Sequence, residues 1–122
     1  MSFHIEFSRA LVAQKVEQMF PKEQWAEVFR VLSFDNVHPD PVGQAGQARI
    51  QLAILKVSGG DLNKLAETAR MAKIDERDVL TMAEYPSLLR DGRVDMSQKD
   101  EAGDRQQYVD WINNKPGPKE RV

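Results

Sequence analysis

The chain of 122 residues contains no cysteine, and this absence excludes several kinds of site at once. Without thiols there is no disulfide framework, no cysteine nucleophile and no cysteine-ligated zinc or iron–sulfur cluster. Histidine is scarce too, since only His4 and His38 are present. His38 lies near Asp35 and Asp40, but one imidazole with flexible carboxylates falls short of the three or four convergent ligands of an ordinary metal site. We therefore expect no metal and no cofactor.

Charge of one sign is not concentrated anywhere in the chain. The 17 lysine and arginine residues are balanced by 19 aspartate and glutamate residues, which leaves a net charge of −2. A protein that binds nucleic acid without sequence preference draws most of its affinity from a positive field, and this composition does not supply one. Nucleic acid is therefore disfavoured as a partner.

Long apolar runs are missing as well. The longest candidate, RIQLAILKVS, is interrupted by Gln51 and Lys56, whereas a membrane-spanning helix needs roughly 20 apolar residues. The first ten residues, MSFHIEFSRA, lack the basic and apolar regions of a secretory signal. Together with the absence of cysteine, these features predict a cytoplasmic protein without a membrane span.

The motifs of common catalytic sites do not occur. The sequence has no HExxH pair and no GxSxG elbow. The run Gly59-Gly60-Asp61 lacks the lysine and the further glycines of a phosphate-binding loop, and is better explained as a helix end followed by a helix cap. We therefore predict no catalytic residues and a non-enzymatic protein.

What the sequence does contain is helical periodicity. Trp25, Val28, Phe29 and Leu32 recur at spacings of three and four, which is typical of one face of a helix. The segment 43–58 carries apolar residues around so much of its circumference that we expect it to be the most buried helix. The predicted fold is all-α, an irregular bundle of five or six helices. The predicted helices lie at about 8–19, 21–34, 43–58, 61–72, 75–84 and 97–114.

The two ends of the chain are predicted to differ from the helical bundle. Residues 1–114 are expected to form a single helical domain, and residues 115–122 a disordered polar tail. Near the N-terminus, Phe3, Ile5 and Phe7 alternate with polar residues. This pattern is compatible with a short strand or with an arm that packs aromatic side chains on the bundle, and we favour the arm.

Residues 65–84 have nearly the apolar spacing of a helix-turn-helix motif, with Ala69 in the first helix, Ile74 in the turn and Val79 in the second helix. However, the second helix begins with Asp75-Glu76-Arg77-Asp78. Three carboxylates would then face the phosphates and base edges of DNA, which is electrostatically unfavourable. We therefore favour a structural helical corner over a DNA-binding motif.

The last predicted helix is mostly polar, and Ser97 and Asp100 have the spacing of a capping box at its start. Its only apolar spot consists of Tyr108, Trp111 and Ile112. An aromatic spot on a charged helix is a candidate contact for a partner protein or for a second copy of the chain. The alternative, which we favour, is that these side chains attach the helix to its own bundle.

The segment 48–86 contains QLAILKV, then GDL, then a run that ends in DVLTMAEYP. It resembles small uncharacterised bacterial helical proteins that share a QLAxLKL…GDL…DxRDVLxxAEYP pattern over this stretch. The resemblance implies a bacterial, cytoplasmic origin and a recurring fold, but no activity. Within it, Arg49, Asp75, Arg77 and Asp78 are candidates for a structural cluster of ion pairs and caps at the helical corner.

The sequence therefore favours a small, non-enzymatic helical protein that acts through protein–protein contacts or self-association. Two alternatives remain open. One is a helix-turn-helix DNA-binding regulator that uses residues 65–84. The other is an enzyme of unrecognised type, with a site built from Arg49, Asp75 and Arg77.

Overall fold

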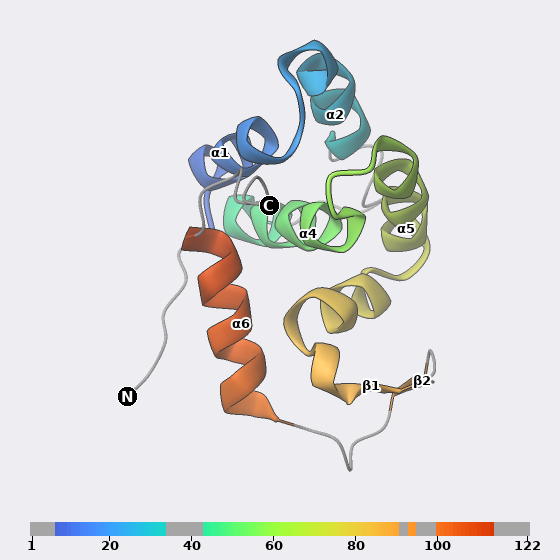
Figure 1. Cartoon of the computed structure of the whole chain (residues 1–122). Coiled ribbons are helices and arrows are strands. Elements are labelled where there is room, and N and C mark those ends of the chain that lie inside the picture. Colours follow the sequence, from blue (N-terminus) through green and yellow to red (C-terminus); the bar gives the residue numbers. More distant parts are fainter. Residues whose placement is uncertain (1–6, 34–42, 91–92, 95–99, 114–122) are drawn as a thin grey trace.

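A computed structural model describes residues 7–33, 43–90, 93–94 and 100–113 of the chain. The predicted all-α bundle is confirmed (Figure 1). The described residues form the α-helices α1 (Arg9–Met19), α2 (Trp25–Leu32), α4 (Gln44–Ser58), α5 (Leu62–Glu84) and α6 (Glu101–Asn113). A 3-10 turn, η1 (Lys22–Gln24), precedes α2, and a second one, η2 (Pro86–Leu88), follows α5. Beyond η2, two strands of two residues each, β1 (Leu89–Arg90) and β2 (Arg93–Val94), pair as an antiparallel hairpin.

Local sequence signals determine how α1 and α2 begin. The hydroxyl oxygen of Ser8 accepts a hydrogen bond from the Leu11 amide at 3.1 Å, so Ser8 is the N-cap of α1. Pro21 lies before the turn η1 rather than in the first turn of an α-helix, and α2 starts only at Trp25. The indole nitrogen of Trp25 donates to the Phe20 carbonyl at 2.8 Å, which ties the start of α2 to the end of α1.

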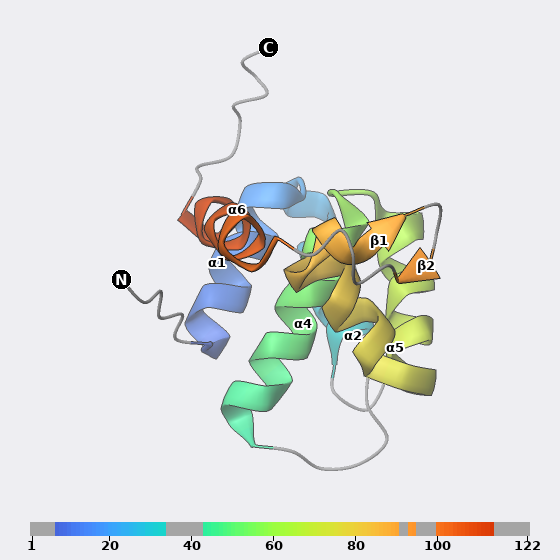
Figure 2. The same cartoon turned by 90° about the horizontal axis from the view of Figure 1, so that it is seen from below.

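Helix α4 lies at the centre of the fold, with α1 and α5 packed against it (Figures 1 and 2). Four consecutive residues, Leu52 to Leu55, have no exposed surface. Since consecutive helical residues point in four different directions, α4 must be covered on all sides. The prediction that this is the most deeply buried helix is confirmed. It ends at Gly59, whose φ of 61° is the left-handed conformation that glycine adopts without strain.

Helix α5 contains the predicted corner. The carboxylate of Asp61 caps its start by accepting hydrogen bonds from the amides of Asn63 and Lys64. Asp75 then interrupts the helical conformation, with φ of −157° and ψ of 99°. Its carboxylate accepts a hydrogen bond from the Arg77 amide at 3.0 Å and so caps the second half of the helix. The two helices predicted at 61–72 and 75–84 are therefore two halves of one kinked element.

Helix α6 starts later than predicted. The helix begins at Glu101, and the carboxylate of Asp100 caps it by accepting a hydrogen bond from the Gly103 amide at 3.1 Å. Asp100 is therefore the N-cap itself and not the third residue of a capping box. Ser97, the predicted cap, lies outside the described residues.

Some sequence-based predictions concern parts of the chain that the structure does not describe. These are the N-terminal strand or arm at Phe3 and Ile5, both histidines, and the tail 115–122. Phe7, the last residue of the alternating N-terminal pattern, is described and packs against the hydrophobic core. In the ranges that are described, no helix has the length and hydropathy that a bilayer crossing requires.

The burial of α4 can be tested by comparing two isoleucine substitutions, one at a buried position of α4 and one at an exposed position of α5. Ile54→Ala should lower the free energy of unfolding by about 2–5 kcal/mol, because Ile54 is fully buried and truncation leaves a cavity. Ile74→Ala, at a residue that is 88% exposed, should stay within about 0.5 kcal/mol of the wild type. Urea unfolding in dilute solution measures both. Equal losses would contradict the assigned burial of α4.

Candidate functional site

The predicted aromatic spot of α6 faces the chain's own bundle. Tyr108 and Ile112 are only 3% and 8% exposed. Trp111 packs against the core and stacks on Tyr108, with ring centroids 5.7 Å apart and planes inclined by 18°. Within this chain, the three side chains therefore attach α6 to the bundle, which is the alternative that the sequence favoured.

Lys15 of α1 secures the C-terminal end of α6. Its ammonium group donates to the Trp111 carbonyl at 2.5 Å and to the Gln18 amide oxygen at 3.0 Å, and it lies 4.4 Å from the centre of the Trp111 ring. A cation at a helix C-terminus is favoured by the helix dipole and by unpaired carbonyl groups. Lys15 is only 3% exposed, and burial lowers its pKa to about 8. Neither its position nor its role is apparent from the sequence.

The other end of α6 is also held by polar contacts, which are partly buried at Asp104 and exposed at Gln107. The amide and the hydroxyl of Ser87 in η2 both donate to the carboxylate of Asp104. Lys56 of α4 donates to the Gln107 side-chain oxygen at 3.0 Å, and its ammonium lies 5.9 Å from the centre of the Tyr108 ring. Helix α6 is thus attached to α1, α4 and η2 along its length.

The predicted cluster of Arg49, Asp75, Arg77 and Asp78 does not form one site. The guanidinium of Arg49 makes two hydrogen bonds, of 2.8 and 2.7 Å, to the carboxylate of Glu84, more than two helical turns beyond Asp75. Asp75 pairs with Arg77 at 3.0 Å, and Asp78 is exposed. Asp75 and Arg77 thus fulfil the predicted capping and pairing role, but Arg49 belongs elsewhere. The enzyme site postulated from Arg49, Asp75 and Arg77 is therefore not assembled.

The Arg49–Glu84 pair and the Tyr108 ring belong to the same region of the core. Burial raises the pKa of the Tyr108 hydroxyl, the Glu84 carboxylate raises it further, and Arg49 opposes the shift. This buried hydroxyl has no hydrogen-bond partner among the described residues. Glu84 is itself well covered, with 10% of its side chain exposed against 43% for Arg49. We assign this polar region to holding α4, α5 and α6 together.

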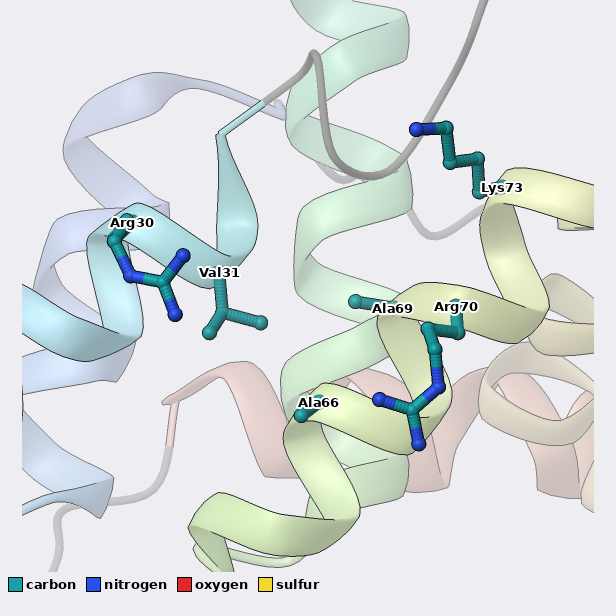
Figure 3. A pocket seen from close by; sticks show the side chains of 6 residues that line it. All are labelled: Arg30, Val31, Ala66, Ala69, Arg70 and Lys73. Atoms are coloured by element: carbon teal, nitrogen blue, oxygen red, sulfur yellow. The ribbon is translucent and has the colours of Figure 1, made fainter.

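A pocket of about 210 Å³ lies between α2 and the first half of α5 (Figure 3). Its apolar lining consists of Val31, Ala66 and Ala69. Three cations complete the lining: Arg30 from α2, and Arg70 and Lys73 from α5. Figure 3 shows Arg30 and Arg70 extending from opposite helices, with Arg70 reaching toward Ala66 and Lys73 at the opposite end. The pocket therefore combines a hydrocarbon floor with a positive rim.

The charges at the rim are unequally compensated. Arg30 forms an ion pair with Glu27 of the same helix at 2.5 Å, and both side chains are largely exposed. Arg70 and Lys73 are exposed and make no ion pair with the described part of the chain. An ion pair at an exposed site is weak and screened by solvent, so the pairing of Arg30 removes little of the local positive potential.

Exposed apolar side chains gather on the same two helices. The large hydrophobic residues that are exposed in the described ranges are Phe29 of α2 and Met71 and Ile74 of α5. Ile74 is 88% exposed, and on a helix it neighbours Arg70 and Met71 at spacings of four and three. From the sequence, Ile74 was identifiable only as the turn residue of a motif. The pocket was not predictable, because Arg30 and Arg70 are forty positions apart.

The acidic side chains of the described residues are not grouped in a way that would hold a metal ion. In the described part of the chain, no three histidine or carboxylate side chains come close enough to hold an ion. The α2–α5 pocket has only cations and hydrocarbon on its lining, so it suits an anionic or apolar group and not a metal.

The buried position of Lys15 predicts a specific pH dependence. The folded state releases the Lys15 proton near pH 8, whereas the unfolded chain holds it up to 10.5. Between these values the unfolded state binds more protons, so stability should rise with pH. Urea midpoints across this window should increase for the wild type relative to Lys15→Met, which removes the titrating group. Parallel curves for the two proteins would refute the assigned burial of this ammonium.

The Arg49–Glu84 pair predicts unequal effects of two arginine substitutions. Arg49→Met leaves the covered carboxylate of Glu84 without its partner and should lower stability by about 1–2 kcal/mol, since solvent partly screens the half-exposed Arg49. Arg77→Met is the matched control and should cause no measurable change, because its pair with Asp75 is exposed. Thermal unfolding measures both. A larger loss for Arg77→Met would contradict the division of the predicted cluster.

Comparison of the chain with protein-family models, with curated proteins and with solved structures finds no match. The resemblance of residues 48–86 to small bacterial helical proteins therefore stays an expectation from the sequence. Any functional assignment has to be argued from the surface chemistry of this chain, and the α2–α5 pocket with its exposed apolar neighbours is the feature that requires an explanation.

Proposed function

We propose that the chain is a small, cytoplasmic, non-enzymatic helical protein that acts through protein–protein contacts. The contact region is the α2–α5 surface, defined as the pocket residues Arg30, Val31, Ala66, Ala69, Arg70 and Lys73 together with Met71 and Ile74. The observation that carries the proposal is the 88% exposure of Ile74 beside a cation-rimmed pocket. Burying one such side chain contributes roughly 1.5–3 kcal/mol to an association.

The size of the pocket supports a protein partner over a small-molecule ligand. Its volume of about 210 Å³ is below the roughly 300 Å³ at which ordinary ligand sites begin. A pocket of this size suits one anchoring side chain of a docked protein. The surrounding exposed apolar residues extend the contact beyond the pocket, as the core of a protein interface requires.

The chemistry of the lining supports binding over catalysis. Arginine does not release its proton at any ordinary pH, so Arg30 and Arg70 cannot act as general bases. The remaining lining residues are Val31, Ala66, Ala69 and Lys73. None of the six is a carboxylate, imidazole or hydroxyl that would complete a nucleophile–base pair.

Charge also favours protein over nucleic acid. The cations of the pocket are followed along α5 by Asp75, Glu76 and Asp78, and the chain as a whole carries a net charge of −2. A duplex that approached the pocket would bring its phosphates close to these carboxylates. A protein surface with both carboxylate and apolar groups meets no such conflict.

A photo-crosslinking amino acid in place of Ile74 tests the proposed function in cells. It should give a defined protein adduct, whose yield falls strongly when Arg70→Glu and Lys73→Glu are added. The same amino acid in place of Gln14, which is exposed on α1, is the control and should give no such adduct. The proposal fails if position 74 yields no protein adduct and light scattering shows a monomer up to the solubility limit.

A further inference from the structure

We infer that the α2–α5 surface binds a second copy of this chain in a two-fold dimer, in which Ile74 of each copy fills the pocket of the other. The inference rests on the proposed function and names its partner. It follows from three properties of the surface: the placement of Ile74 beside the pocket, the charges that follow Ile74, and the volume of the pocket.

The placement of Ile74 makes the surface complementary to itself. The protruding side chain and the pocket lie on the same stretch of α5, because Ile74 directly follows the lining residue Lys73 and lies one turn beyond Arg70. A two-fold axis makes each patch contact its own equivalent. One such axis can therefore place Ile74 of each copy in the pocket of the other copy at the same time. The resulting assembly is a closed dimer that needs no further copies.

The charges that follow Ile74 are opposite to those at the pocket rim. Asp75 and Asp78 lie just after the protruding side chain, whereas Arg30, Arg70 and Lys73 surround the pocket. A two-fold axis across α5 runs the two copies of this helix in opposite directions, which brings the acidic stretch that begins at Asp75 in one copy toward the basic stretch that ends at Lys73 in the other. Figure 3 shows the Arg70 guanidinium reaching toward Ala66. The opposite charges of these two stretches lead us to expect an Asp78–Arg70 ion pair between the copies.

Three of these five charges make no ion pair within the described part of one chain. Arg70 and Lys73 make no ion pair with the described residues, and neither does Asp78. Asp75 has its pair with Arg77 and keeps it in the dimer, since it also caps the second half of α5. With a net charge of only −2, two copies approach each other without strong overall repulsion.

The volume of the pocket agrees with an isoleucine as its occupant. A space of about 210 Å³ lined by valine and alanine takes a branched aliphatic group, and the cations at the rim remain available to carboxylates around it. Met71, which is 41% exposed and three residues before Ile74, extends the apolar contact between the two helices. The buried centre and charged rim match the usual layout of a protein interface.

Charge exchange between Arg70 and Asp78 tests the dimer directly. Sedimentation equilibrium should show a wild-type dimer and much weaker self-association for Arg70→Glu and for Asp78→Arg, since each variant places like charges opposite one another. An equimolar mixture of the two variants should form a heterodimer, because both contacts then have opposite charges. The chain with both substitutions should dimerise again by itself. Both residues are exposed, so circular dichroism should show an unchanged fold.

The apolar contact has its own test in Ile74→Ala, which should weaken the dimer at least about thirty-fold, the effect of removing an interface hot spot. Gln14→Ala, an exposed position on α1, is the control and should leave the dimer intact. A wild-type dimer that is insensitive to all these substitutions would place the interface elsewhere and overturn the inference.

The outcomes also separate this inference from the proposed function. If the wild type stays monomeric while position 74 crosslinks to a different protein, the inferred dimer is wrong, but the α2–α5 surface remains a protein contact. A gel shift at low salt could show that the wild type binds DNA and that Arg70→Glu abolishes the binding. Both the inferred dimer and the proposed protein contact would then be wrong. A wild type that stays monomeric and gives no adduct at position 74 would overturn both the inferred dimer and the proposed function.

Discussion

The burial of α4 on all sides is the constraint on which the rest of the structure depends. The apolar residues of this helix are spread around its whole circumference, so one neighbouring helix cannot cover them. Helix α5 covers one side and α1 another, and the glycine pair after Ser58 reverses the chain so that α5 returns along α4. The kink at Asp75 then directs the second half of α5 to the Arg49 end of α4, where Glu84 meets its partner.

Covering α4 also explains what α6 does within the chain. Tyr108 and Ile112 are buried, and Lys15, Lys56 and Asp104 make polar contacts along the helix. A lysine that gives up most of its hydration is costly unless carbonyl groups and an aromatic ring replace the water, and Lys15 has both. The aromatic groups of α6 are thus used inside the fold, and the large apolar side chains that remain exposed in the described ranges lie on α2 and α5.

Local features of the sequence predicted the helices well, because each depends on residues within a few positions. Asp61 and Asp75 were recognisable as caps, and the glycines after Ser58 as a helix end. The partners of distant residues were not predictable. Arg49 was grouped with Asp75 because both lie in the segment 48–86 that resembles other proteins. Its partner in the structure is Glu84, which is thirty-five positions from Arg49 and has no local signature. The pocket likewise requires the packing of α2 on α5, which periodicity alone does not fix.

Hydrogen–deuterium exchange at low and high protein concentration tests most directly that two copies of the chain meet through the α2–α5 surface. We expect α4 to exchange slowest at both concentrations, because it is the most buried helix. We also expect higher concentration to slow exchange in Trp25–Leu32 and in the stretch of α5 around Arg70 to Asp78, with α1 and α6 unchanged. Concentration-dependent protection confined to α6, or none anywhere in the chain, would contradict a dimer that forms through the α2–α5 surface.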